Sequence, residues 1–258
     1  MRRLALVGRL GWLCRLGLLG VAGLGLALLA PAGASAAPAP LVDVFVVGRT
    51  DVLRESTEVR ARAASVKIAG KTCRVADGTP LAALKALRLR GGPAYSLRDY
   101  GSCSRRVADA GGLFVTKLGR DRNQGRDGWV YKVGRKVGST SAGDASGPFG
   151  SGRLRAGDAV TWFWCVSQSA GGCQRTLEVK SARTVGPGAS LSVTVRGFDD
   201  QGGGRPIAGA SVSFAGTTSL TGDDGKATVT APPAGGLYTV TAAKSGMVRS
   251  RPLEVAVR

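Results

Sequence analysis

Few side chains in this sequence could carry out catalytic chemistry, which narrows the enzyme classes open to it. The 258 residues contain no histidine, so Ser-His-Asp and Cys-His nucleophilic mechanisms lack their imidazole base. An enzyme would have to use a carboxylate pair, such as Glu55 with Glu58 or Asp223 with Asp224. In a strand the first pair would point to opposite faces, and the second pair lies in the hairpin-turn sequence TGDDGKA. No feature supports a lysine nucleophile, and we therefore expect no catalytic residues and no enzyme.

The cysteines indicate disulfides. Cys14 lies near the N-terminus, and the other four are Cys73, Cys103, Cys165 and Cys173. An even set in an exported chain is typical of disulfides, and four cysteines allow three pairings. We favour Cys73 with Cys103 and Cys165 with Cys173, because the second pair closes the short loop CVSQSAGGC. A metal site is the alternative, but without Cys-x-x-Cys spacing or histidine we expect none.

The N-terminus has the pattern of a secretory signal. It begins MRR, continues with the apolar run Leu16–Ala30, and reaches the small residues Ala34–Ala36. This order predicts a signal peptide over residues 1–36 that is cleaved after Ala36. An uncleaved anchor is the alternative, since Arg9 and Arg15 lengthen the positive region, but the run is shorter than the ~20 residues of a spanning helix. We expect a secreted or extracytoplasmic protein with no transmembrane segment after cleavage.

The chain is strongly basic. Its net charge is +19, and removing the four arginines of residues 1–36, which hold no acid, lowers it to +15. Such a charge attracts anionic polymers, so the expected partners are a small molecule or an anionic envelope polymer. The densest basic stretch, Lys117–Lys136, fits a solvated loop leading into a hairpin better than a phosphate site. Nucleic acid is not expected, because the aromatic residues should face inward.

Four aromatic residues are the candidates for ligand binding. Trp129 and Tyr131 alternate along one expected strand, and Trp162 and Trp164 alternate along another, so each pair shares one strand face. We expect Trp129 and Trp162 in the core, with Tyr131 and Trp164 partly exposed at the loop end of the sheet. The alternative is that all four are buried, because a small domain needs large aromatic residues for its core.

These candidates lie in an expected α+β domain over residues 41–173. The stretch DGTPLAALKALRLRGG carries helix signals: Thr79 as N-cap, Pro80 at the first position and Gly91 as the stop. The helix should lie on a sheet. The expected strands are Leu41–Gly48, material within Thr57–Ala69, Tyr95–Tyr100, Leu113–Leu118, Trp129–Val133 and Ala159–Cys165.

Residues 174–258 predict a second, all-β unit. Short alternating strands are separated by Gly, Pro and Asp turns at the spacing of a β-sandwich. The protein as a whole should be mainly β, and we expect its two halves to fold independently, with the boundary near Gly171 and Gly172. The expected core of the second half is Val193, Val195, Val212, Phe214, Val229, Tyr238 and Val240.

Two family resemblances follow from these motifs. GWVYKVGRKVG followed by RAGDAVTWFWC is similar to the signature of a bacterial family of unknown function related to the C-terminal β domain of transcobalamin and intrinsic factor. The similarity covers most of residues 41–173 and departs at Gly134–Arg135 and at Cys165. It implies a cap over one side of cobalamin, the one cofactor suggested. The motifs PIAGASV, TGDDGKATV and GLYTVTA resemble bacterial Ig-like and carboxypeptidase-regulatory, or prealbumin-like, modules, which implies a structural spacer.

The sequence therefore favours one function class over two others. We expect an exported, non-catalytic binding protein of the cell envelope, whose first domain recognises a small ligand or envelope component beside an Ig-like spacer. The alternative is a purely structural or adhesive envelope protein whose aromatic faces are only core. An enzyme is the least favoured class, because no catalytic constellation is present.

Overall fold

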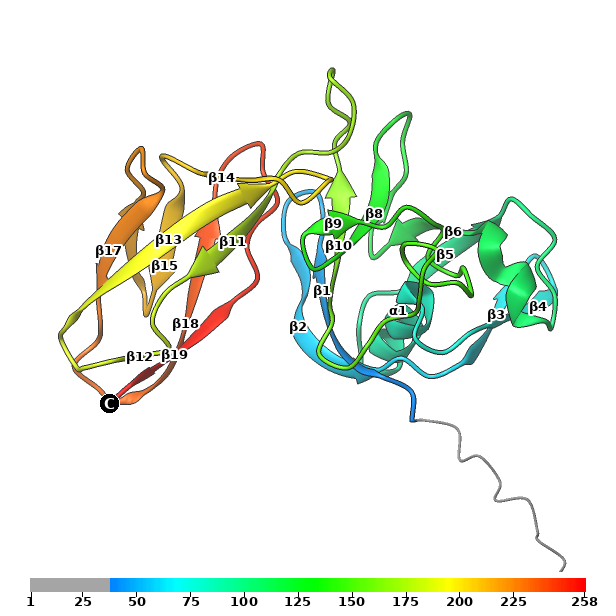
Figure 1. The fold of residues 1–258 in the computed structure, drawn as a ribbon, viewed down its shortest axis with the longest axis horizontal. Coiled ribbons are helices and arrows are strands. Elements are labelled where there is room, and N and C mark those ends of the chain that lie inside the picture. The colour runs from blue at the N-terminus through cyan, green and yellow to red at the C-terminus, as the bar shows by residue number, and fades with distance from the viewer. Residues whose placement is uncertain (1–37) are drawn as a thin grey trace, which may run out of the picture. The chain divides into compact units, whose positions relative to one another are not determined.

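The central element of the first half is a five-stranded sheet. The computed structural model describes residues 38–258, so the expected signal peptide and Cys14 lie outside the described residues. The strands lie in the order β2 (Val52–Arg60), β1 (Leu41–Val47), β10 (Ala159–Cys165), β8 (Gly128–Val133) and β9 (Lys136–Val137). Strands β1 and β10 are parallel and the other pairs antiparallel. Figure 1 shows β1 and β10 side by side although they come from opposite ends of this half.

One α-helix, α1 (Pro80–Leu89), lies among the described residues, and it forms for the reasons that the sequence indicates. The Thr79 hydroxyl accepts a hydrogen bond of 3.2 Å from the main-chain nitrogen of Ala82, which satisfies a free donor of the first turn. The helix buries its apolar side, including Leu81, Leu84 and Leu87, in the core of the first half. Gly91 follows the end with a φ of +79°, a conformation that glycine adopts readily. The predicted helix is confirmed.

Smaller elements and one disulfide complete the first half. A hairpin consists of β3 (Ala64–Ile68) and β4 (Lys71–Val75), and a three-stranded sheet of β5 (Tyr95–Asp99), β6 (Leu113–Leu118) and β7 (Asp121–Arg122), with the 3-10 helix η1 (Val107–Gly112) before β6. Cys73 in β4 is bonded to Cys103, and Cys165 at the end of β10 is bonded to Cys173. Both predicted disulfides are confirmed.

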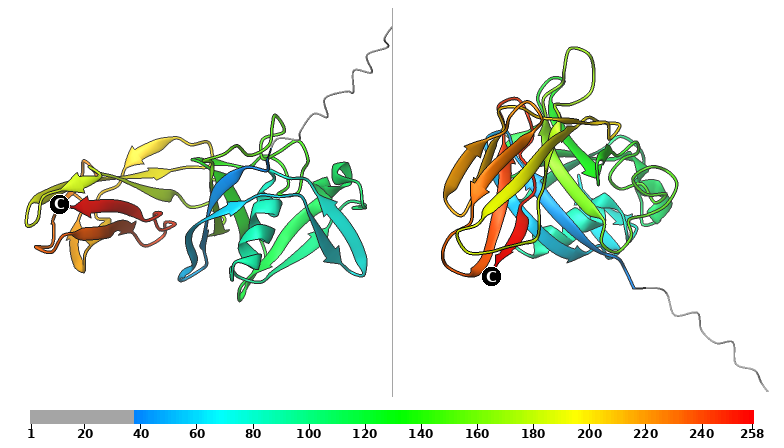
Figure 2. Two further views of the ribbon diagram at one scale, coloured as in Figure 1. Left: turned by 90° about the horizontal axis from the view of Figure 1, so that it is seen from below. Right: turned by 60° about the vertical axis from the view of Figure 1, so that its left-hand side comes forward.

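The second half is a β-sandwich of two sheets (Figure 2). Alternate residues of both sheets meet in one apolar core, and six of the seven predicted core residues are buried. The seventh, Tyr238, is half-buried and packs against that core. One sheet holds β11 (Thr176–Lys180), β13 (Ser190–Phe198), β14 (Gly204–Pro206) and β17 (Lys226–Thr230); the other holds β12 (Thr184–Val185), β19 (Leu253–Val257), β18 (Gly236–Ala243), β15 (Ser211–Phe214) and β16 (Thr217–Leu220). The mainly β fold is thus confirmed.

The two halves share apolar and polar contacts. Residues 38–258 cluster as one compact unit, and Phe45, Phe163 and Val248 belong to one small apolar cluster that draws on both halves. Arg251 of the second half donates to the carboxylate of Asp43 and, at 2.8 Å, to the main-chain oxygen of Val160. Independent folding of the halves stays a prediction. Across residues 38–258, no helix is both long and apolar enough to cross a membrane.

Candidate functional site

The four aromatic candidates lie on one face of the central sheet and are all buried. The pairing of β8 with β10 sets Tyr131 opposite Trp162 and Trp129 opposite Trp164. Their exposed fractions are 7% for Trp129, 5% for Tyr131, 1% for Trp162 and 2% for Trp164. The expectation that Tyr131 and Trp164 are partly exposed is therefore wrong, and the alternative, burial of all four, is what the structure has.

Chain segments that the strand pattern does not reveal cause this burial. Gly138, directly after β9, lies so close to the Tyr131 ring that a Cβ atom on it would come within 2.1 Å of a ring carbon. The Tyr131 hydroxyl donates a hydrogen bond of 2.9 Å to the main-chain oxygen of Thr140. Trp164 is covered differently, by the Arg49 guanidinium, whose carbon lies 4.7 Å from the centre of the indole ring. Each covering residue comes from outside the strand that it covers.

The aromatic rings contact each other in pairs across the two strands. Trp129 and Trp164 meet edge to face, with their centres 5.9 Å apart and their planes at 87°. The rings of Tyr131 and Trp162 lie 5.3 Å apart at 48°. Such pairs add to the stability gained by burial alone. The rings therefore contribute to the core whatever else they do.

The polar groups of the two β8 side chains have hydrogen-bond partners, whereas those of the two β10 side chains have none among the described residues. On β8, Trp129 Nε1 donates to the main-chain oxygen of Asp121 at 2.8 Å, and Tyr131 has the partner given above. On β10, neither Trp162 Nε1 nor Trp164 Nε1 has a hydrogen-bond partner within residues 38–258. A buried donor left without an acceptor costs about 1–3 kcal/mol. Burial also raises the pKa of Tyr131 from 10.0 to about 12, so its hydroxyl stays a donor even in moderately alkaline solution.

Three of the four candidates line one small cavity, which we name the aromatic cavity. Its volume is about 200 Å³, and its walls include Trp129, Tyr131, Trp162, Phe114 and Ser141. Phe114 is 46% exposed, which marks a side on which the cavity reaches the surface. The Ser141 hydroxyl is buried and, like Trp162 Nε1, has no hydrogen-bond partner in the described part of the chain. Apolar walls with a few polar groups are the usual composition of a small-molecule site.

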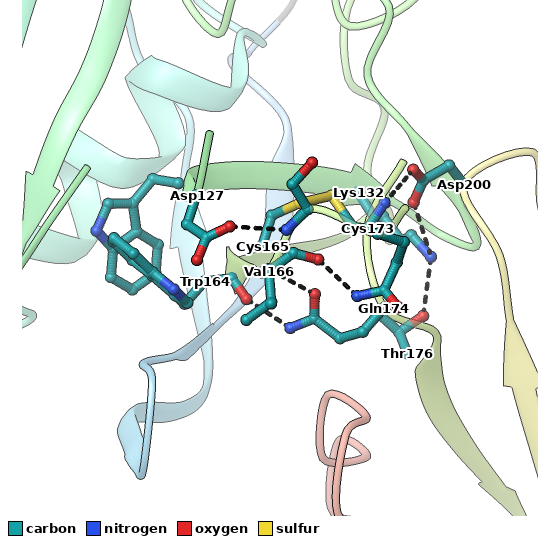
Figure 3. Close-up of a disulfide and its surroundings, with 12 residues drawn as sticks. Asp127, Lys132, Trp164, Cys165, Val166, Cys173, Gln174, Thr176 and Asp200 are labelled. Carbon is teal, nitrogen blue, oxygen red and sulfur yellow. Dashed lines mark hydrogen bonds and ion pairs between the residues drawn. A yellow bond between two sulfur atoms is a disulfide. The ribbon is translucent and has the colours of Figure 1, made fainter. Parts of the chain in front are cut away.

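Trp164, the fourth candidate, lines a different hollow. This hollow, the Arg49 groove, has a volume of about 770 Å³ and contains residues from both halves, among them Arg49 and Lys244. Figure 3 shows how the groove end of β10 is held: Gln174 donates to the Trp164 carbonyl at 2.7 Å and accepts from the Val166 nitrogen at 2.8 Å. The Cys165–Cys173 disulfide lies beside this bridge. The structure thus brings three candidates together and separates the fourth.

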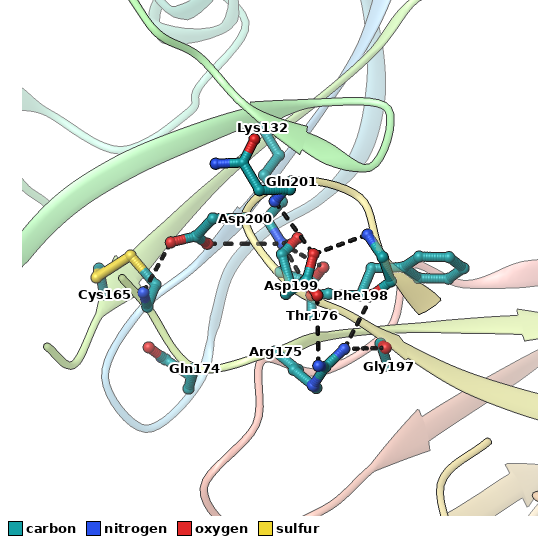
Figure 4. A network of polar contacts seen from close by, with 12 residues as sticks. Lys132, Cys165, Gln174, Arg175, Thr176, Gly197, Phe198, Asp199, Asp200 and Gln201 are labelled. Atoms are coloured by element: carbon teal, nitrogen blue, oxygen red, sulfur yellow. Dashed lines mark hydrogen bonds and ion pairs between the residues drawn. A yellow bond between two sulfur atoms is a disulfide. The ribbon is translucent and has the colours of Figure 1, made fainter. Parts of the chain in front are cut away.

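Lys132 is a buried residue that the sequence reading missed. Its side chain is 1% exposed, and its Nζ donates to the carbonyl oxygens of Phe198 and Asp199 at 3.0 and 2.8 Å and to the Thr176 hydroxyl at 3.1 Å (Figure 4). Burial lowers the pKa of Lys132 to about 8, an effect that Asp200, 4.0 Å away, opposes. The strand pattern could have placed Lys132 opposite the aromatic face, but it gave no sign that the second half covers it.

The carboxylate pairs form no common site. Glu55 and Glu58 are both exposed on β2, and Asp224 accepts a hydrogen bond of 2.9 Å from the nitrogen of Lys226 within a turn. Within residues 38–258, no three side chains of His, Cys, Asp or Glu gather as metal ligands would. The candidate aromatic residues instead line two hollows in which a ligand could be held, the aromatic cavity and the Arg49 groove.

Comparison of the chain with known protein families, curated proteins and solved structures finds no match. Any functional assignment therefore depends on the chemistry of the chain's own residues.

Proposed function

We propose that this protein is an exported, non-catalytic binding protein whose aromatic cavity receives part of a small ligand. One observation carries the proposal: Trp162 and Ser141 line the same cavity, and the Nε1 of one and the hydroxyl of the other are buried without hydrogen-bond partners among residues 38–258. Buried polar groups in folded proteins are nearly always hydrogen-bonded, so each exception needs an explanation. A ligand that supplies the partners explains both atoms at once.

The cavity defines the chemistry of that ligand. An indole nitrogen only donates, so the ligand must offer an acceptor to Trp162, whereas the hydroxyl of Ser141 can donate or accept. The other walls are aromatic or apolar and suit a flat ring. Whole drug-sized ligands occupy about 300–1,000 Å³, and the cavity has about 200 Å³. It therefore fits a ring-sized group, either alone or as the end of a larger molecule.

The similarity of residues 41–173 to the transcobalamin-related family is the reason to include cobalamin among the ligands tested. So large a molecule could place only one peripheral group in a cavity of about 200 Å³. The proposal does not depend on cobalamin, because any ring-sized group with an acceptor would satisfy Trp162. Peptidoglycan fragments belong in the same screen as candidate envelope components.

The proposal also places the protein outside the cytoplasm, in the cell envelope. The signal-like N-terminus and the two disulfides support an oxidising compartment outside the cytoplasm. The second half, similar in its motifs to Ig-like modules, would act as a spacer, and the basic charge would favour anionic envelope polymers. A purely structural or adhesive protein is the second candidate, and burial of all four aromatic side chains favours it.

The test is a thermal-shift screen with small heteroaromatic compounds, cobalamin and peptidoglycan fragments, since a ligand that binds only the folded state raises Tm. A compound in the cavity should also move the indole ¹H–¹⁵N signal of Trp162, which Trp162→Phe assigns. Ser141→Ala should weaken binding about 2- to 10-fold, the effect of one neutral hydrogen bond. Ser192→Ala, at an exposed position of β13, is the matched control.

The two candidate functions give different results. If no compound raises Tm and the Trp162 signal stays fixed, the binding role is excluded and the structural role remains. Binding that is unchanged in Ser141→Ala and does not move the Trp162 signal would place the ligand outside the aromatic cavity and contradict the proposal.

A further inference from the structure

The Arg49 groove combines a ligand-sized volume with positive charge. Its volume of about 770 Å³ lies within the range of small-molecule sites. Three basic side chains line it, Arg49, Lys244 and Arg249, and one acidic side chain, Asp51. Walls of one charge sign concentrate ligands of the opposite sign. The balance of charge in the groove therefore depends on whether Asp51 neutralises its basic neighbours.

Asp51 is already engaged elsewhere. Its carboxylate accepts from the Thr50 hydroxyl at 2.5 Å and from the Arg120 guanidinium at 2.7 Å. These two groups hold the pKa of the Asp51 carboxyl below its usual value, so it remains ionised and paired with Arg120. Arg120 does not line the groove. The ion pair therefore takes up the one carboxylate in the lining and leaves the three basic groups in excess.

A main-chain hydrogen bond and stacking on an aromatic ring hold Arg49 in place, so its guanidinium donors are not used up in an ion pair with any described residue. Its main-chain nitrogen donates to Asp121 Oδ2 at 3.0 Å, and its guanidinium lies over the Trp164 ring at 4.7 Å. Among residues 38–258, its one side-chain hydrogen bond is a long one, 3.4 Å to Gln124 Oε1. A guanidinium has five N–H donors, so most of the donors of Arg49 have no protein acceptor. Arg49 is exposed, so in the free protein these pre-positioned donors face water, which a ligand would replace.

Trp164 supplies a second, independent observation. Its side chain is 2% exposed and lines the groove, yet its Nε1 has no hydrogen-bond partner in the described chain. An indole N–H needs an acceptor and cannot itself accept. A single acceptor placed beside them by a ligand would serve both the indole N–H and the guanidinium stacked on the ring.

We propose that the Arg49 groove is a binding site for an oxyanion, the phosphate or carboxylate group of a small molecule. The anion accepts from Trp164 Nε1 and from the guanidinium of Arg49, and Lys244 adds positive charge. Val47 and Met247 provide apolar wall for the rest of the molecule. This site is separate from the aromatic cavity, since the two linings share no residue.

The indole signals in ¹H–¹⁵N spectra test this proposal site by site. The protein is titrated with inorganic phosphate and, separately, with succinate, and Trp164→Phe assigns the Trp164 signal. The Trp164 signal should move and saturate. The Trp129 signal should not, because its N–H is already bonded to Asp121. A shift of the Trp162 signal alone would report the aromatic cavity instead, so the two sites can succeed or fail separately.

Because Arg49 is exposed, its variants should remain folded, so that their anion binding can be measured. Arg49→Gln should weaken anion binding about 10-fold or more, as expected for losing a hydrogen bond to a charged group. Arg49→Lys should be intermediate, because it keeps the charge and loses the planar stacking on Trp164. Arg105→Gln removes the same charge at an exposed position outside the groove and should leave affinity unchanged.

Each outcome decides the matter. Saturable movement of Trp164 with phosphate alone assigns a phosphate ligand, and movement with succinate alone assigns a carboxylate. The proposal is overturned if neither anion moves the Trp164 signal, if the signals of Trp129, Trp162 and Trp164 move together, or if Arg105→Gln weakens binding as much as Arg49→Gln. The last two results would show general attraction to a basic protein rather than a site.

Discussion

The side-chain nitrogen of Lys132 lies 2.8 Å from the main-chain oxygen of Asp199, 67 residues further along the chain. The first residue belongs to the central sheet of the first half, and the second follows β13 of the sandwich. Arg175 reinforces the turn that presents this oxygen, donating to the carbonyls of Gly197 and Gly203 (Figure 4). A buried amine therefore ties the two halves together, chiefly through the main-chain oxygens of Phe198 and Asp199, which no side-chain substitution removes.

Replacing Lys132 should weaken the whole structure. Lys132→Met keeps an unbranched side chain, one atom shorter, but leaves the acceptors of Phe198 and Asp199 without their donor. We expect a loss of about 3 kcal/mol in the free energy of unfolding, the lower end for breaking a buried charged pair. Urea unfolding measures it, with Lys180→Met at an exposed position as the control. Equal losses in both variants would show that the buried amine has no special role.

The same residue gives the protein a pH dependence of defined sign. Burial lowers the pKa of Lys132 from 10.5 to about 8, so between these pH values the unfolded chain holds a proton that the folded chain has released. The contribution of Lys132 to the free energy of unfolding should therefore rise with pH in this window, by less than about 1.4 kcal/mol per pH unit. The difference between wild type and Lys132→Met, measured from pH 7.5 to 9.5, isolates this contribution. A difference that is constant or falls would contradict the lowered pKa.

Tyr131 should act in the opposite direction at higher pH. Because burial raises its pKa from 10.0 to about 12, the folded protein keeps a proton that the unfolded chain loses above pH 10. Stability from this group is therefore present below pH 10 and is lost as the pH approaches 12. Tyr131→Phe should remove one tyrosine ionisation at high pH from the near-ultraviolet titration of the folded protein. The ionisation of Tyr95, whose pKa is also raised to about 12, should remain. An unchanged high-pH ionisation in the variant would show that Tyr131 titrates normally.

Gly138 should tolerate no side chain. A Cβ atom there would lie 2.1 Å from the Tyr131 ring, so Gly138→Ala should cost about 1–3 kcal/mol through forced movement of the ring or of the segment. In Gly186→Ala the nearest atom would be 3.7 Å away, an ordinary contact, which makes it the matched control. The cost of Gly138→Ala should shrink in a Tyr131→Leu background, as a double-mutant cycle by urea unfolding would show. Equal costs in both backgrounds would place the strain elsewhere.

The two disulfides should differ in their effect on stability. Cys73 and Cys103 are 30 residues apart and Cys165 and Cys173 are 8 apart. In the loop-closure account, replacing both cysteines of a pair with serine costs about 3.6 kcal/mol for the longer loop and about 2.5 kcal/mol for the shorter. Unfolding in urea compares the two double variants with wild type. A larger loss for the 165–173 pair would mean that its bridge supports the end of β10 directly, beyond restricting the unfolded chain.

Local signals in the sequence predicted the local structure well. Thr79, Pro80 and Gly91 act over one or two helical turns, and the helix forms where they place it. The short Cys165–Cys173 loop is a similar case. Such features depend on neighbours in the chain, so their causes are visible in the sequence itself.

The candidate site was predicted only in part, because its covering residues are distant in the sequence. Alternation placed Trp164 on the correct strand face, but Arg49, which covers it, comes 115 residues earlier. The burial of Lys132 depends likewise on Phe198 and Asp199. Period-two patterns say which face a residue occupies, and they do not say what packs on that face. The sequence therefore did not allow the solvent exposure of these side chains to be predicted.

The parallel pairing of β1 with β10 also determines when the first half can fold. Strand β1 (Leu41–Val47) pairs with β10 (Ala159–Cys165). A growing chain therefore cannot complete its central sheet until more than a hundred further residues have been synthesised. Pairings this distant in sequence slow folding, because a long loop must close before its contacts contribute. A chain halted before Ala159 would leave the inner edge of β1 unpaired, with apolar Val44 and Val46 beside it. Until β10 has been synthesised and has paired with β1, that open strand edge is where incomplete chains would aggregate.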